Sequence, residues 1–168
     1  MNHQNRLYFL IISVLILAAC DKRPDIEVLE QRFYQHQTQF EVISKVACSI
    51  RSELNTRWLR YEVNSGEQFS DSLSEEFQML DQLMTKIGAE HIVLQQKGAP
   101  GCTLHITQWS SAFAGSGITI GFSFQPTEII EYHPDLYDTK GTPEVERKEI
   151  RFTKPLASGW YIEYHKYG

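Results

Sequence analysis

The arrangement of hydrophobic and polar positions changes twice along this 168-residue chain. A mostly apolar run occupies residues 7–17, and apolar positions spaced by three and four then dominate from residue 25 to residue 87. From residue 91 onward, apolar and polar residues largely alternate. Spacing by three and four predicts amphipathic helices, whereas alternation predicts strands with one buried face.

The first periodic segment predicts a helix from Asp25 to about residue 50. Pro24 suits a helix start, and acidic residues in the first turn complement the positive end of the helix dipole. A continuous helix of this length would extend for about 40 Å. We expect its apolar stripe to pack under a sheet, with His36 as a packing residue in the same stripe. The stripe consists of Ile26, Leu29, Phe33, Phe40, Ile43, Ala47 and Ile50.

Ser72 and Glu75 have the spacing of a capping box, which predicts that a second helix begins there. Gly88 is suited to the C-cap of this helix, because glycine adopts the left-handed conformation without strain. The apolar face between them consists of Phe77, Leu80, Leu83, Met84 and Ile87. Segment 57–63, which lies between the two predicted helices, fits either a continued helix or a short strand.

Alternation, with turns rich in Gly and Pro, predicts the strands of the second half. They are 91–95, 102–109, 118–124, 146–154 and 160–167. Helices that precede a run of strands indicate the α+β class. We therefore expect two helices packed on one face of an antiparallel sheet of four to six strands.

The N-terminal run has the features of a secretory signal. One cation at Arg6 precedes the apolar residues, small residues follow, and the run is shorter than the ~20 residues that a spanning helix needs. The stretch Leu17-Ala18-Ala19-Cys20 resembles the lipobox of bacterial lipoproteins, in which a peptidase cuts before the cysteine and the new N-terminus is acylated. This resemblance implies lipidation at Cys20 and attachment to a membrane at the periplasmic face. Asp21 resembles an inner-membrane retention signal of enteric lipoproteins; the outer membrane is the alternative.

The predicted organisation is a signal peptide at 1–19, a short lipid tether at 20–24 and one globular domain at 25–168. Removing 19 of the 168 residues leaves 149, which suits one domain with a substantial core. The mature chain has 15 Lys and Arg against 21 Asp and Glu, a net charge of −6. It has no basic stripe, so nucleic acid is not expected as a partner.

Cys48 and Cys102 are the two cysteines beyond the lipobox. An exported protein can form disulfides, and a bridge between them would stabilise the fold by about 2–4 kcal/mol. Two separate buried thiols are the alternative, because free cysteine packs as a small hydrophobic residue. A zinc pair is disfavoured, since neither cysteine has a second ligand at the usual spacing.

No catalytic motif or cofactor-binding loop occurs in the sequence, which therefore predicts neither an enzyme, a cofactor nor a metal site. The most polar cluster is Glu128, Glu131, His133 and Asp135, and such clusters are usually solvated surface. An enzyme would require a pocket that joins Glu128 or Glu131 to His133 or His105.

The aromatic C-terminal strand offers a candidate partner surface. Trp160, Ile162 and Tyr164 should face the core, which leaves the other row exposed. Tyrosine-rich exposed rows are typical of recognition surfaces, and we expect a partner at Tyr161, His165 and Tyr167.

Part of the mature chain also resembles a group of small exported bacterial proteins of uncharacterised activity. The resemblance implies a similar fold and compartment and no activity. It is carried by Phe77, Leu80, Leu83, Ile87 and Gly88, by the strand pair around 117–124, and by Gly159, Trp160, Tyr161 and Tyr164.

These observations predict a membrane-anchored periplasmic lipoprotein that acts as a non-enzymatic binding or supporting component of the cell envelope. One alternative is an immunity or inhibitor lipoprotein that neutralises a toxin or a cell-wall hydrolase. The other alternative is an envelope enzyme.

Overall fold

The computed structural model describes residues 23–65, 71–95, 101–137 and 149–168. The helices are α2 (Ile26–Gln35), α3 (Gln37–Leu54), α4 (Ser74–Lys86) and the single turn α5 (Pro134–Tyr137). The strands are β1 (Trp58–Glu62), β2 (His91–Gln95), β3 (Thr103–Phe113), β4 (Ser116–Phe124), β5 (Glu149–Pro155) and β6 (Trp160–Tyr167).

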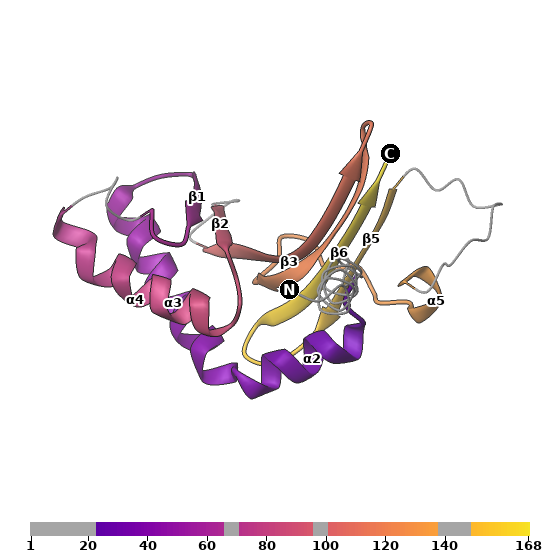
Figure 1. Cartoon of the computed structure of the whole chain (residues 1–168), viewed down its shortest axis with the longest axis horizontal. Coiled ribbons are helices and arrows are strands. Elements are labelled where there is room, and N and C mark those ends of the chain that lie inside the picture. The colour runs from indigo at the N-terminus through magenta and orange to yellow at the C-terminus, as the bar shows by residue number, and fades with distance from the viewer. Residues whose placement is uncertain (1–22, 66–70, 96–100, 138–148) are drawn as a thin grey trace, which may run out of the picture.

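The described strands form one sheet in the order β1-β2-β3-β4-β6-β5, with every neighbouring pair antiparallel. Figure 1 shows α2, α3 and α4 along one side of this sheet. The predicted α+β class, with helices packed on one face of an antiparallel sheet, is therefore confirmed.

The N-terminal apolar stripe is buried along its whole length, but the helix that carries it is broken. Instead of one straight helix there are two, α2 and α3, which meet at His36 and change direction there (Figure 1). His36 leaves helical geometry at φ −121° and ψ 21°. The break lets the stripe follow the sheet. Phe33 and Phe40, which flank it, are both fully buried, and their ring centres are 4.9 Å apart.

An aromatic cluster joins the helices to the sheet. The ring of Phe40 in α3 lies 4.7 Å from that of Phe122 in β4 and 5.0 Å from that of Trp160 in β6, between centres. All three side chains are at most 1% exposed. Aromatic pairs at such distances add about 0.5–1.5 kcal/mol to the stabilisation from burial alone.

The start of α4 differs from the prediction, whereas its end agrees. The helix begins at Ser74, with Leu73 at the N-cap position and without a side-chain cap, so the predicted capping box of Ser72 is wrong. The reason is that residues 71–73 already form a 3₁₀ turn that leads into the helix. At the other end Gly88 has φ +68°, and its N–H donates to Thr85 O at 3.1 Å. This is the expected glycine C-cap.

The ambiguous segment 57–63 contains a strand. β1 pairs with β2. The preceding helix α3 ends at Leu54, and its C-cap residue Asn55 has a left-handed conformation. Asp81 of α4 holds this strand in place, because its Oδ1 atom accepts hydrogen bonds from the Tyr61 hydroxyl at 2.6 Å and the Asn64 N–H at 2.8 Å. The ring of Tyr61 is fully buried.

Cys48 and Cys102 form a disulfide, with their Cα atoms 5.7 Å apart. Cys48 lies in α3, and Cys102 directly precedes β3. The bond therefore ties the helix layer to the sheet across 54 residues of sequence.

The first described residues are bound to the domain. Arg23 places its guanidinium 4.0 Å from the ring centre of Tyr137 and donates to the Tyr137 carbonyl oxygen at 2.7 Å. The Tyr137 hydroxyl donates to the carbonyl oxygen of Pro24. Burial raises the pKa of Tyr137 to about 12, so the hydroxyl stays protonated at neutral pH.

Candidate functional site

The sheet has a second face, which α2, α3 and α4 leave uncovered and which we call the open face. Alternation along β3 sends His105 to this face, whereas Leu104 and Ile106 are buried in the core. The same alternation in β6 separates Glu163 from the buried Ile162. Polar residues of several strands consequently share one surface.

Strand register decides which of these polar residues become neighbours. Thr119 of β4 lies opposite His165 of β6, which in turn lies opposite Arg151 of β5. One step along the same face, Glu163 lies opposite Gly121, where the backbone of Ile106 comes so close that a Cβ atom would not fit. Side chains at directly opposed positions lie close together, so Thr119, His165 and Arg151 are neighbours on the open face.

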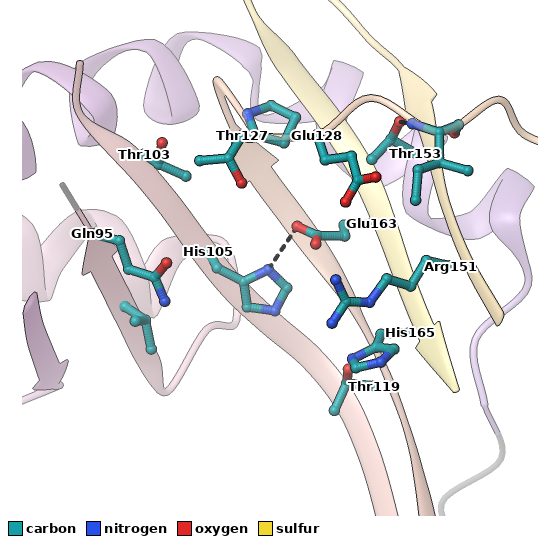
Figure 2. A pocket seen from close by; sticks show the side chains of 13 residues that line it. Gln95, Thr103, His105, Thr119, Thr127, Glu128, Arg151, Thr153, Glu163 and His165 are labelled. Atoms are coloured by element: carbon teal, nitrogen blue, oxygen red, sulfur yellow. Dashed lines mark hydrogen bonds and ion pairs between the residues drawn. The ribbon is translucent and has the colours of Figure 1, made fainter. Parts of the chain in front are cut away.

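A basin of about 280 Å³ occupies the open face. Its volume is close to the lower end of the range of about 300–1,000 Å³ that is typical of small-molecule sites. Figure 2 shows its side chains converging from several strands. The lining residues are Val93, Gln95, Thr103, His105, Thr119, Pro126, Thr127, Glu128, Ile130, Arg151, Thr153, Glu163 and His165.

One wall of the basin is the connection 126–130 that follows β4. The residue before it, Gln125, has φ +47°, and its N–H donates to Gly159 O at 2.9 Å. The connection ends where the Thr153 N–H donates to Ile130 O at 2.7 Å and the Ile130 N–H donates to Thr153 Oγ1 at 3.0 Å. The connection is held at both ends, so its side chains have defined positions over the sheet.

The side chains of His105 and Glu163 form a polar pair in the basin. Nδ1 of His105 lies 3.3 Å from Oε2 of Glu163, and the two side chains are 28% and 36% exposed. Burial raises the pKa of Glu163, but the hydrogen bond and charge of His105, with smaller contributions from Ser123 and Arg151, bring that pKa below its usual value. Glu163 is therefore ionised at neutral pH.

Arg151 lies at the opposite side of the basin. Its Nε atom is 2.8 Å from Oε1 of Glu149, a half-exposed carboxylate. Nε2 of His165 is 3.2 Å from the same oxygen, without the alignment of a hydrogen bond. The ring of His165 also lies 5.2 Å from that of Tyr167, between centres.

The structure separates the residues of the predicted partner surface. Tyr161, His165 and Tyr167 follow one another along the open face of β6. His165 lines the basin, and Tyr167 packs beside it and is 36% exposed. Tyr161 lies near the start of β6, is half-buried and is not among the lining residues. Their role in binding stays a prediction.

The polar cluster of the 126–135 segment is also divided. Glu128 lines the basin together with His105. Glu131, His133 and Asp135 are exposed and lie outside the lining.

Sequence reasoning missed the pair of His105 and Glu163 as the centre of the site. Alternation indicates that each faces away from the core, but β4 lies between their strands and 58 residues separate them in sequence. Arg151 was missed because it lies in a third strand, β5, and alternation does not indicate that β5 is the neighbour of β6.

Among the residues that the structure describes, no group of three His, Cys, Asp or Glu side chains is arranged to hold a metal ion. The side chains that line the basin can form hydrogen bonds and contacts with charged groups. No protein-family model, curated protein or solved structure matches the chain.

The predicted lipidation site Cys20, the signal 1–19 and Asp21 lie outside the described residues. No helix in the described ranges is both long enough and apolar enough to cross a membrane.

Proposed function

We propose that this chain is a lipid-anchored protein of the bacterial cell envelope that binds another envelope component through the open face, without catalysing a reaction. The observation that supports binding is the difference between the two faces of the sheet. Helices and apolar side chains cover one face, whereas the other is hollowed and lined with polar and charged groups. Concave sites with a few converging polar groups are typical of recognition.

Sequence features support the location. The apolar run 7–17 and the lipobox at Cys20 indicate export and acylation. Because Arg23 and Pro24 are bound to Tyr137, only residues 20–22 would separate the lipid from the folded body. Three residues reach about 10 Å at full extension, so the domain would work close to the bilayer surface.

Replacing the lipidated cysteine tests the location. Cys20→Ser should be neither cleaved nor acylated, because both steps depend on the cysteine, so its intact mass should retain residues 1–19 and include no acyl chain. Intact mass of the wild-type protein should correspond to residues 20–168 plus acyl chains. A wild-type protein that retains its leader, or a variant that still carries acyl chains, would contradict the proposal.

Replacing the predicted partner surface tests the binding. The variant with Tyr161→Ala, His165→Ala and Tyr167→Ala should lose envelope partners in crosslinking and pull-down while its circular dichroism is retained. The matched control carries Val28→Ala and Met79→Ala, two exposed apolar residues of the helix layer, and should keep these partners. Identical partners for both variants would remove the open face from the proposal.

The identity of a captured partner separates support from inhibition. If it is a toxin or a cell-wall hydrolase, and binding stops its activity, the protein acts as an immunity or inhibitor lipoprotein. Binding that leaves the partner's activity unchanged favours a supporting role.

The pair of His105 and Glu163 favours a second candidate function, general acid–base chemistry in the basin. Glu163 holds the Nδ1 side of the ring, and Glu128 supplies a further carboxylate in the same hollow. Wild-type protein and His105→Gln should be incubated with peptidoglycan fragments and with phospholipids and the products analysed by mass spectrometry. Products that form with the wild type alone would move the function to catalysis.

A further inference from the structure

The side chains that line the basin include two carboxylates, Glu128 and Glu163, and one guanidinium, Arg151, which lies away from Glu128. Figure 2 shows Glu128 beside Thr127 at one end, Glu163 in the middle beside His105, and the guanidinium of Arg151 and the ring of His165 toward the other end. Glu149, which pairs with Arg151, is not among the lining residues. The basin is therefore a dipolar site, and its field has a direction.

Each end retains capacity to bind. Arg151 uses Nε for Glu149, and its two Nη groups carry four further N–H donors directed over the basin in Figure 2. Glu163 directs Oε2 to His105, and the Glu128 carboxylate is exposed at the wall. A carboxylate accepts several hydrogen bonds, so the acidic end can accept a donor group such as an ammonium.

This arrangement disfavours ligands that carry one sign of charge. A purely anionic ligand would meet Glu128 and Glu163, and a purely cationic ligand would meet Arg151, whose charge Glu149 offsets only in part from outside the lining. Like charges brought together at short range are repulsive, particularly where water is partly excluded. Among the described lining residues there is no Phe, Tyr or Trp side chain on which a sugar ring could stack.

We propose that the basin binds a small zwitterion, such as a short peptide with free termini, with its ammonium group at Glu128 and Glu163 and its carboxylate at Arg151 and His165. Gln95 and Thr103, which line the side of the basin next to His105, offer amide and hydroxyl groups to the uncharged middle of the ligand, and Thr119 lies beside His165 at the carboxylate end. This inference rests on the proposed binding function and names the class of ligand for the open face.

The test uses full-length protein in detergent and three forms of one dipeptide. L-Alanyl-L-alanine has both charges, its Nα-acetyl form lacks the ammonium, and its C-terminal amide lacks the carboxylate. Calorimetric titration should show that the zwitterion binds about tenfold more tightly than either blocked form, because each blocked form loses one charged contact.

Two variants show which end of the basin binds which charged group of the ligand. Glu128→Gln should abolish the preference for the free amine and keep the preference for the free carboxylate. Arg151→Gln should abolish the preference for the free carboxylate and keep the preference for the free amine. A structural defect would weaken all three dipeptides equally, and only a direct contact moves one ratio alone.

The chain offers a matched control for each variant. Glu131→Gln changes an exposed carboxylate on the same segment outside the basin. Arg60→Gln changes an arginine paired with Glu62 on β1, in the same spacing as Arg151 and Glu149. Both controls should bind the three dipeptides as the wild type does.

Equal affinity for the three dipeptides, or no binding of the zwitterion, would overturn the inference. If the dipeptides do not bind while the open face still captures an envelope partner, the inference fails and the proposed function stands. If the zwitterion binds selectively while the wild-type protein retains its leader and carries no acyl chain, the inference stands and the proposed location fails.

Discussion

The two faces of β6 are built from alternate residues of one strand, yet they have different roles. Trp160, Ile162 and Tyr164 point into the core and are at most 1% exposed. Glu163 and His165 point the other way into the basin. Burial of apolar surface stabilises the fold, whereas partly exposed charges contribute little to stability and remain available for recognition. Substitutions on the covered face should therefore unfold the protein, and those on the open face should change what it binds.

The largest effect is expected from Phe40→Ala, which removes the aromatic contact between α3 and the sheet. The loss of burial and the cavity left behind should lower the free energy of unfolding by about 3–5 kcal/mol, measured by urea denaturation. Thr119→Ala on the open face is the comparison and should stay within about 0.5 kcal/mol of the wild type. Equal losses for the two variants would contradict the division between the faces.

The next effect concerns the disulfide that joins the covered face to the helices. The double variant Cys48→Ala, Cys102→Ala should lose about 2–4 kcal/mol of stability, because its unfolded chain is no longer cross-linked. Reducing agent should cause a similar loss in the wild type and none in the double variant. A reductant effect that persists in the double variant would show that another group is responsible.

A glycine on the open face is expected to matter for stability. The β3 chain has a bulge between Thr107 and Trp109, and a Cβ atom added at Gly121 would overlap the carbonyl oxygen of Ile106. Gly121→Ala should therefore cost about 1–3 kcal/mol by thermal or urea unfolding. A loss as small as that of Thr119→Ala would show that the backbone of β3 relaxes easily.

The smallest effect is expected from Glu163→Gln, and it depends on pH. The pKa of Glu163 is lower in the folded protein, so the unfolded chain binds its proton more readily and acid favours unfolding. The carboxylate's stabilisation is complete above the unfolded pKa of about 4.3 and is lost as pH falls through the folded pKa.

Glu163→Gln should therefore lose less stability than the wild type between pH 6 and pH 3, by an amount below about 1 kcal/mol for this partly exposed pair. His105→Ala should flatten the profile in the same direction, because it removes the main partner of the carboxylate. Urea denaturation across this pH range is the measurement. A variant profile that is parallel to the wild type would contradict the lowered pKa.

Local patterns predicted the elements better than their junctions. The bounds of β2 and β6 agree with prediction, since alternation and flanking turns are local properties of the chain. The break at His36 was not predicted, because the apolar stripe continues through it without a change of spacing. The bulge near Gln108 also had no sequence signal, and it appears only where β3 pairs with β4.

The candidate site was predicted in fragments. His165 and Glu128 were singled out from their own segments, and both line the basin. Their proximity could not be predicted, because one lies in β6 and the other in a connection anchored to β5 by Thr153.

By itself, the sequence determined the helical and alternating segments and the face on which each strand residue lies, and it predicts export and lipidation at Cys20. These follow from the 3.6- and 2-residue periods of the backbone and from short-range composition. Only the tertiary structure decided which strands are neighbours, and with them the pairing of His105 with Glu163 and the opposed charges of the basin. Strand order and register depend on how side chains distant in sequence pack together, and alternation along one strand carries no information about the identity of the next.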